Sequence, residues 1–267
     1  MDDTNLATAP SALVTAPRIL SAAAQSFALT GLVLALVLAA LWAAGLAPWE
    51  SVTLAAAAFA GGSSIVLIGL HRGGGGMAAF GGCNHVTTAR LGMAALLAGA
   101  VASPGLVAPD GALVWPALAL AVTALILDGV DGWMARRSGL TSAFGARFDM
   151  EVDAATIMIL ATLAWQTGQA PIWVLALGLI RYAFVLCGLR WSFLRADLPP
   201  SFRRKVVCVV QVVILAALLA PVIVPPVSTA LAALGLAALA WSFAIDVYWQ
   251  WRHAGPDRPA PAPRCGP

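Results

Sequence analysis

Long apolar stretches, separated by short polar segments or by Pro and Gly, follow one another along most of this chain. Each stretch has about the 20 residues that a helix needs to cross the hydrocarbon core of a bilayer. Eight stretches qualify, near 27–47, 52–70, 86–107, 113–132, 149–167, 171–190, 205–224 and 228–249. They are continuous runs rich in Ala and Leu, not the short alternating segments of a closed barrel. The pattern predicts an all-α polytopic membrane bundle of about eight transmembrane helices.

Basic residues divide the connections between these stretches into two kinds. The connections without Lys or Arg are those near 48–51, 108–112, 168–170 and 225–227. The other connections, the span ends next to them and both terminal segments hold every basic residue except Arg181, which lies inside a span; Arg90 lies just beyond the second connection. Because Lys and Arg collect on the cytoplasmic side of a membrane, we expect both termini and the 132–148 connection to be cytoplasmic. The protein is expected in the bacterial inner membrane, with a site near this connection facing the cytoplasm.

The ends of the chain differ from its apolar middle. Residues 1–26 are expected to be a tail or a short helix on the membrane surface, and 251–267 a disordered tail rich in Pro. The region 27–76 is expected to hold two helices and a flexible joint at the Gly73–Gly76 run. No internal repeat is evident, which weakens a transporter interpretation because many transporters are built from repeats.

Composition agrees with a membrane protein. Of the 267 residues, 61% are hydrophobic and 10% are charged, against about 25% charged in soluble domains. The formal net charge of +3 is too small to indicate a nucleic-acid partner. The four cysteines form no CxxC pair, so neither a disulfide framework nor a zinc site is indicated.

Four carboxylates lie close together near the middle of the chain. Asp128 and Asp131 are three residues apart at the end of one expected span, and Asp149 and Asp153 are four apart at the start of the next. Residues at these separations share a helix face. Since the 132–148 connection makes the two helices antiparallel neighbours, the four side chains are expected to converge at the cytoplasmic membrane surface. Ionisable residues at membrane depth are functional candidates by default.

Converging carboxylates repel one another unless cations lie between them. Mg²⁺ is commonly held by carboxylates together with substrate phosphates, and a pair of such ions can assist a phosphoryl displacement. Gly132 and Gly145 permit close approach of a ligand, and the Arg136 guanidinium suits phosphate oxygens. A cation transporter or channel would also explain buried acids, but not the spacing of these Gly and Arg residues.

That spacing resembles the full motif of the CDP-alcohol phosphotransferase family, class I. It reads Asp128-x2-Asp131-Gly132-x2-Ala135-Arg136-x8-Gly145-x3-Asp149-x3-Asp153. Upstream, Asn84-x2-Thr87-x2-Arg90 is similar to the start of the family's first core helix. The resemblance implies a six-helix core over about 84–250, with the two preceding helices added outside it.

The resemblance also implies a role for each residue of the motif. Asp128, Asp131, Asp149 and Asp153 would ligate two divalent metal ions, Mg²⁺ or Mn²⁺, and Asp153 would be the general base. The CDP pocket would be formed by Asp131, Gly132, Ala135, Arg136 and Gly145. The implied reaction moves a phosphatidyl group from CDP-diacylglycerol, or a similar CDP-lipid, to a small alcohol and releases CMP. The implied partners are these substrates, membrane lipids and a second copy of the chain in a homodimer. A catalytically dead relative is the remaining alternative, and the complete set of aspartates argues against it.

The acceptor alcohol is expected to meet basic residues. Arg181, Arg190 and Lys205 are candidates for binding a phosphorylated acceptor, with Asp246 as a partner for the deeply placed Arg181. Arg195 and Arg203 are interpreted as topology residues, and Glu151 points away from the aspartates on an ideal helix. Relatives that use glycerol 3-phosphate carry Gly-Lys-x-Lys-Thr-x-x-Gln in this region. In the segment 204–211 only Lys205 and Gln211 match that pattern, so the acceptor stays open between glycerol 3-phosphate, inositol phosphate and another phosphorylated alcohol.

Overall fold

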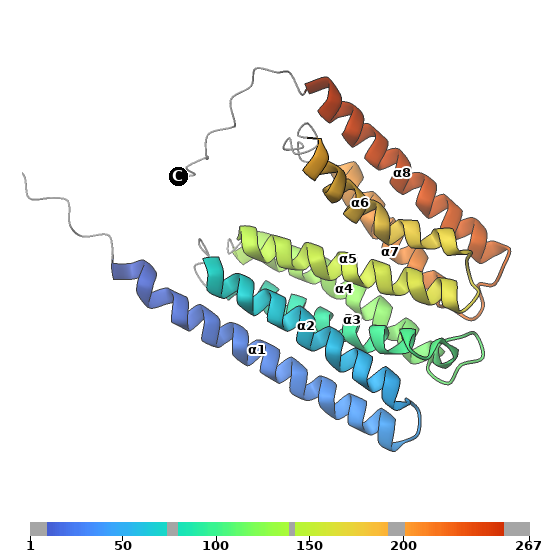
Figure 1. Cartoon of the computed structure of the whole chain (residues 1–267), viewed down its shortest axis with the longest axis horizontal. Helices are drawn as coiled ribbons and strands as arrows, with labels where there is room; N and C mark the ends of the chain where they lie inside the picture. The colour runs from blue at the N-terminus through green and yellow to red at the C-terminus, as the bar shows by residue number, and fades with distance from the viewer. Residues whose placement is uncertain (1–9, 74–79, 139–141, 192–200, 254–267) are drawn as a thin grey trace, which may run out of the picture.

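A computed structural model of the protein describes residues 10–73, 80–138, 142–191 and 201–253. For residues 10–17, 73, 131, 133 and 135–138 only the helical backbone is described. Within these ranges there are eight α-helices, two short 3₁₀ turns and no strand (Figure 1). The helices are α1 (Pro10–Ala43), α2 (Trp49–Gly73), α3 (Gly82–Val101), α4 (Val114–Ser138), α5 (Ala143–Gln166), α6 (Ala176–Arg190), α7 (Phe202–Leu218) and α8 (Val227–His253). The turns are η1 (Pro104–Leu106) and η2 (Ile172–Leu175). The predicted helical bundle is confirmed.

The first helix is longer than the first apolar stretch. Residues from Pro10 onward, expected as a tail or a surface helix, continue without a break into the first span as α1. The Ala-rich segment before Phe27 favours helix, so the helix does not need lipid contact to extend this far. Residues 1–9, 74–79 and 254–267 lie outside the described structure, and with them most of the Gly73–Gly76 joint and of the C-terminal tail.

Four segments in the described ranges are long and apolar enough to cross a membrane: Arg18–Ala43, Trp49–Arg72, Ile172–Arg190 and Val227–His253. A shorter apolar segment is Val114–Val130. The pattern predicted eight spans, and the helices α3, α5 and α7 complete that number without meeting the same criterion. Most residues of α3 are buried by neighbouring helices, and α5 and α7 carry charged residues near their first turns. The protein is a polytopic helical membrane protein in which α3, α5 and α7 are less uniformly apolar than α1, α2 and α8.

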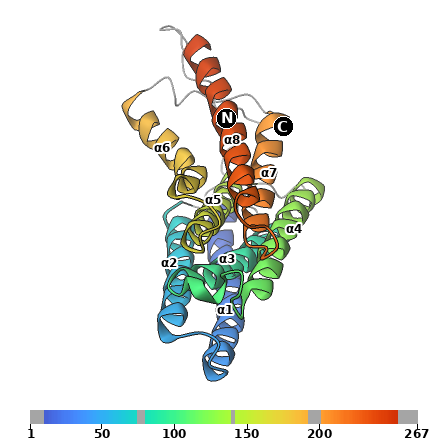
Figure 2. The same ribbon diagram turned by 90° about the vertical axis from the view of Figure 1, so that its right-hand side faces the viewer.

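Helix α3 lies at the centre of the molecule and packs against α1, α2, α4 and α5. Figures 1 and 2 show α1 and α2 on one side of α3 and α5, and α6, α7 and α8 on the other. Close approach of helices to α3 depends on small residues. A Cβ on Gly99 would lie 2.7 Å from the carbonyl oxygen of Ser51 on α2.

Two apolar cores hold this arrangement together. One is centred on α5 and extends to α4, α6, α7 and α8, with Leu160, Leu163 and Leu215 fully buried. The other joins α1 and α2 to α3 and α5, where the Phe27 and Phe148 rings lie 6.1 Å apart. Phe148 directly precedes Asp149, so this second core supports the back of the helix that carries the aspartates.

Candidate active site

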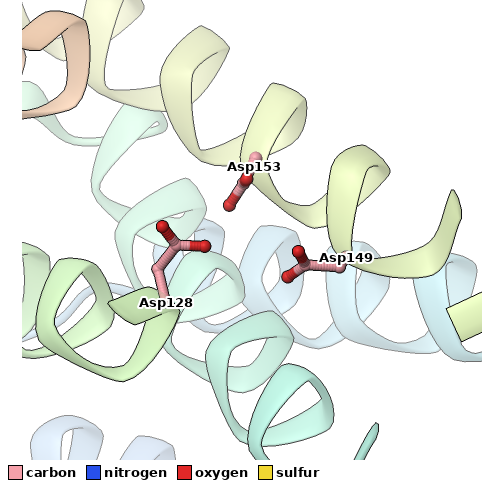
Figure 3. A group of neighbouring side chains, drawn as sticks. All are labelled: Asp128, Asp149 and Asp153. Carbon is pink, nitrogen blue, oxygen red and sulfur yellow. The ribbon is translucent and has the colours of Figure 1, made fainter. Parts of the chain in front are cut away.

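The start of α5 sets the position of its acidic residues. Ser142 is the N-cap, and its hydroxyl accepts a hydrogen bond from the amide of Gly145 at 2.9 Å. A capping serine satisfies an amide at the exposed end of a helix. From this start, Asp149 and Asp153 follow one turn apart on the face directed toward α3 and α4 (Figure 3).

Three carboxylates converge at this face. Asp128 comes from α4, and Asp149 and Asp153 come from α5. One oxygen of each lies within 4.8 Å of the others, and all three side chains are partly exposed (Figure 3). The predicted convergence of the two helices is therefore confirmed for these three aspartates.

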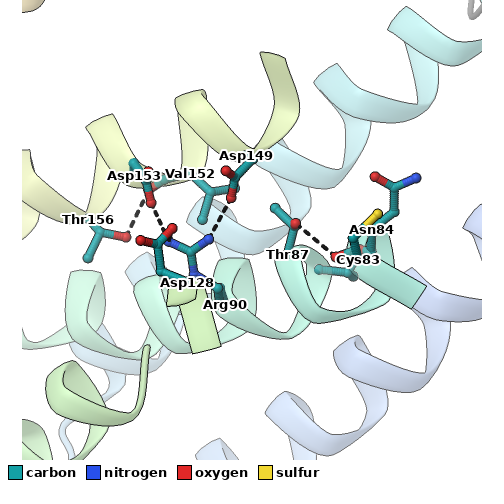
Figure 4. Close-up of polar contacts among 10 residues, drawn as sticks. Cys83, Asn84, Thr87, Arg90, Asp128, Asp149, Val152, Asp153 and Thr156 are labelled. Carbon is teal, nitrogen blue, oxygen red and sulfur yellow. Dashed lines mark hydrogen bonds and ion pairs between the residues drawn. The ribbon is translucent and has the colours of Figure 1, made fainter. Parts of the chain in front are cut away.

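A buried arginine links the three carboxylates. Arg90 on α3 has a side chain only 5% exposed. Its Nη1 donates to Asp149 at 2.5 Å, and its Nη2 contacts Asp128 at 3.0 Å and donates to Asp153 (Figure 4). The free energy of a charge buried this deeply is high unless it is paired. The pairing neutralises part of the negative charge and holds α3, α4 and α5 in register.

The other residues of the motif are placed less completely. Asp131, Ala135 and Arg136 lie on α4, but their side chains fall outside the described structure. Gly132 lies half-buried on the same helix. A Cβ on Gly145 would lie 2.8 Å from Asn84 Oδ1 and 3.0 Å from Ser142 Oγ. The absence of a side chain at Gly145 therefore lets the buried Asn84 of α3 lie close to the start of α5; the expected role of Gly145 in ligand binding stays a prediction.

A large cavity opens beside the aspartates. It has a volume of about 540 Å³ and lies between α5, α6, α7 and α8. Asp153 stands at one side, and the basic residues Arg181, Arg204 and Lys205 line it. Two of the three acceptor candidates therefore share a cavity with the carboxylate expected to act as base. The third, Arg190, is exposed at the end of α6 and does not line this cavity.

The expected pairing of Arg181 with Asp246 is wrong. Arg181 Nη2 contacts Glu151 at 2.6 Å, which joins α6 to α5. Asp246 on α8 instead pairs with Arg203 at 2.5 Å, and Arg204 lies 3.8 Å from it. Arg203 also donates to the Ser242 hydroxyl, so this residue, interpreted from the sequence as a topology residue, also joins α7 to α8. The first residues of α7 lie next to α8. Asp246 on α8 therefore pairs with Arg203 of α7 and not with Arg181 of α6.

One atom of Arg181 is left without a partner. Among the described residues its Nε is buried and has no hydrogen-bond acceptor, although the side chain lines the cavity. Glu151 lies outside the aspartate cluster, as expected, and its side chain contacts Arg181 instead. An acceptor group from a ligand in the cavity would satisfy the remaining donor of Arg181.

Three neighbouring residues were not identified from the sequence as site residues. Arg90, Thr156 and Cys208 line a small space between Asp128 and Asp153. Thr156 is one turn beyond Asp153 on α5, and Cys208 is one turn beyond Lys205 on α7. For Arg90 the separation of three residues from Thr87 was the available sign, since it places both on one face of α3.

The donor set fits a divalent cation. The three carboxylates offer hard oxygen ligands from two helices, and their mutual separation of 4.8 Å or less is close to the span of oxygens around one such ion at about 2.0–2.6 Å from the metal. Asp128, Asp149 and Asp153 are therefore the residues that could hold it. Arg90 provides the positive charge among them in this structure.

Comparison with known proteins identifies one family. The family model described as CDP-alcohol phosphatidyltransferase matches residues 82–245. The match begins at the start of α3 and ends in α8, and it leaves α1 and α2 outside. No curated protein and no solved structure matches the chain.

Proposed function

The chain belongs to the CDP-alcohol phosphatidyltransferase family, and on that premise we propose that it transfers a phosphatidyl group from CDP-diacylglycerol, or a similar CDP-lipid, to a small alcohol. Family membership and the apolar helices make it an integral membrane transferase of phospholipid head-group chemistry. We further propose that CDP-diacylglycerol is the donor and that a phosphorylated alcohol is the acceptor.

The observation that carries the proposal is the position of Asp153. It is one of three carboxylates within 4.8 Å of one another, and it also lines the cavity that contains Arg181 and Lys205. A carboxylate between a cation site and a basic cavity suits a reaction in which a hydroxyl group meets a phosphate. A site for cation transport alone has no use for the basic cavity.

Asp128, Asp131, Asp149 and Asp153 would hold two divalent ions, Mg²⁺ or Mn²⁺. Such ions would stabilise the negative charge of the pyrophosphate and of the oxygen that leaves with CMP. Asp131, Gly132, Ala135, Arg136 and Gly145 bind the CDP moiety. These assignments follow the family motif residue by residue.

In the transfer itself, side chains of the protein accept the proton of the acceptor and keep the carboxylates in position. The acceptor hydroxyl oxygen forms a bond to the phosphorus on the lipid side of the pyrophosphate, and the bond from that phosphorus to the CMP oxygen breaks. Asp153 accepts the hydroxyl proton, which is general base catalysis. Arg90 keeps Asp149 and Asp153 in position through the contacts described above, and acts as a positioning residue.

The acceptor is proposed to occupy the cavity of about 540 Å³. Arg181 and Lys205 would contact its phosphate, supported by the unpartnered Nε of Arg181. Arg190 was a candidate for the same role, and its exposed position at the end of α6 favours a topological role instead. Glycerol 3-phosphate and inositol phosphate are the two acceptors to compare first.

We also propose an orientation in the membrane and an oligomeric state for the enzyme. The distribution of basic residues supports an active site that faces the cytoplasm, both termini cytoplasmic, in a bacterial inner membrane. Family resemblance supports a homodimer. Cross-linking in membranes and accessibility of single cysteines from each side would test these two points.

The test of the function is a screen of acceptors. Purified protein in vesicles with CDP-diacylglycerol and Mg²⁺ or Mn²⁺ is given a panel of alcohols with and without phosphate, and release of CMP is measured. We expect release with at least one phosphorylated alcohol and little without an acceptor. Absence of CMP release with every member of the panel would reject the proposal.

A further inference from the structure

A second cavity lies away from the aspartates. It has a volume of about 260 Å³ and is lined by the end of α1, the start of α2, the end of α3, η1 and the start of α4. On α4 the lining residue nearest in sequence to Asp128 is Leu120, and at 1.5 Å per residue the two are about 12 Å apart along the helix. The cavity is therefore separate from the active site and lies at the opposite end of these helices.

The lining of this cavity is apolar with one exception. Leu38, Leu97 and Val107 are typical, and Ser51 contributes the single polar side chain among the lining residues. Ser51 is only 4% exposed, and among the described residues its Oγ is buried without a hydrogen-bond partner. An unpaired buried hydroxyl is unfavourable, so this donor points to an acceptor supplied by a ligand.

The packing of α2 against α3 explains why no side chain meets this hydroxyl. The contact runs through Gly99, where an added Cβ would lie 2.7 Å from the Ser51 carbonyl oxygen. The two backbones touch at this point, and Gly99 offers no side-chain acceptor. Serines inside helices commonly donate to the carbonyl one turn earlier; Ser51 is near the beginning of α2, which starts at Trp49.

The cavity opens toward lipid. Val37 on α1, 37% exposed, and the exposed Pro116 on α4 both line it, so the opening lies between these helices. Helices α1 and α2 are among those apolar and long enough to cross a membrane. Trp49, two residues before Ser51, is exposed, and exposed tryptophans mark the level of the membrane interface.

From these observations we infer that one acyl chain of an ester-linked glycerolipid of the surrounding bilayer occupies this cavity. The Ser51 hydroxyl donates to its ester carbonyl. An apolar space of this kind excludes water, and its lining loses dispersion contacts when it is empty. The bilayer supplies the hydrocarbon that fills it, and the interfacial level of Ser51 matches the level of lipid esters.

The bound chain would join two parts of the protein. It lies between the α1–α2 pair, which is outside the family match, and α3 and α4, which are inside it. The lipid is neither donor nor product of the proposed reaction. Its binding therefore does not depend on the proposed function, and a test of it requires no turnover.

The experiment uses a photoactivatable phosphatidylcholine with a diazirine near the end of one acyl chain, in vesicles with the full chain. Ester-linked and ether-linked forms of the probe are compared, and labelled peptides are identified by mass spectrometry. Val37→Trp should block the opening. Val33→Trp places the same side chain one turn earlier on α1, at a residue that is 54% exposed and does not line the cavity.

We expect the ester probe to label the helix ends around the cavity, and Val37→Trp to lower this labelling several-fold while Val33→Trp leaves it unchanged. Ser51→Ala should reduce ester labelling to the level of the ether probe. Ser63→Ala is the matched control, because Ser63 on α2 also has a buried, unpartnered hydroxyl but does not line the cavity. Equal labelling in Val37→Trp and Val33→Trp, or equal labelling by both probes in the unchanged protein, would overturn the inference.

Discussion

The aspartate site and the basic cavity share Asp153 but are built in different ways. At the aspartate site three carboxylates surround one arginine, and each of these four described groups contacts a partner of opposite sign. The basic cavity is wide, and its two arginines contact acids on separate helices: Arg181 pairs with Glu151 on α5, and Arg204 lies 3.8 Å from Asp246 on α8. The first arrangement suits a fixed chemical step, and the second leaves room for acceptors of different size and shape.

The two regions also differ in where their residues come from. The carboxylates belong to one short stretch of chain on α4 and α5, joined by a single connection. The cavity draws on α5, α6, α7 and α8, so its shape depends on how four helices pack. Changes at the aspartate site should therefore affect the reaction with every acceptor, and changes in the cavity should distinguish one acceptor from another.

The largest effect is expected from Asp153→Asn. Removing a general base lowers rates by about 10²- to 10⁴-fold, and Asp153 is also a proposed metal ligand, so CMP release should fall by at least this factor for all acceptors. Binding of CDP-diacylglycerol should be largely retained. Asp110→Asn, at an exposed position between α3 and α4, is the control. Substantial turnover by Asp153→Asn would exclude this role.

Arg90→Ala tests how the carboxylates are held together. Removing one partner of a buried ion pair typically costs about 3–5 kcal/mol, so the free energy of unfolding should fall strongly when chelator is present. Added Mg²⁺ or Mn²⁺ should restore part of it, since a cation can replace the lost positive charge. Thermal unfolding in both conditions measures this, with the exposed Arg72→Ala as control. A loss of stability that metal does not change would mean that Arg90 supports packing alone.

Substitutions in the basic cavity should change the binding of the acceptor and not that of the CDP-lipid. Arg181→Gln and Lys205→Met each remove a charge, and a lost charge-assisted hydrogen bond is typically worth about 1.5–3 kcal/mol. We expect the KM of a phosphorylated acceptor to rise by about one to two orders of magnitude, while the KM of CDP-diacylglycerol changes little. Arg190→Gln should leave both constants unchanged. An unchanged acceptor KM in Arg181→Gln and Lys205→Met would reduce these residues to topological roles.

A smaller effect is expected where the aspartate site meets α3. In Gly145→Ala the new methyl group would lie 2.8 Å from Asn84 Oδ1, and Asn84 is 4% exposed with little room to move. Overpacking of this kind typically costs about 1–3 kcal/mol, so the melting temperature and kcat should both fall. Gly61→Ala on α2, where the Cβ meets nothing within 4 Å, should have no effect on kcat. Equal kcat values in the two variants would mean that Gly145 does not govern the position of α5.

The sequence predicted the aspartate site better than the cavity for a physical reason. A separation of three or four residues determines which helix face a carboxylate occupies, and a single short connection determines that α4 and α5 are neighbours. Asp128, Asp149 and Asp153 needed no further information to be placed together. Arg90 could not be placed in the site in this way, because the spacing of residues around it does not show that α3 packs against α4 and α5.

The cavity depends on distances that the spacing of residues along the chain does not contain. Arg181 has two acids that it could reach in principle, and the packing of α6 on α5 selects Glu151, whereas α7 brings Arg203 to Asp246. The same limit applies to α1. Its apolar stretch begins near Phe27, but backbone propensity extends the helix back to Pro10, and hydrophobicity does not report this.

The most direct test of the central claim is the metal dependence of CMP release, with Asp128→Asn measured beside the unchanged protein. We predict that release from CDP-diacylglycerol requires Mg²⁺ or Mn²⁺, stops when the metal is chelated and returns when it is restored. In Asp128→Asn the metal concentration for half-maximal rate should move upward. CMP release that continues in the presence of chelator, or an identical metal dependence in both proteins, would contradict the assignment of the aspartates as the metal site of a phosphatidyl transferase.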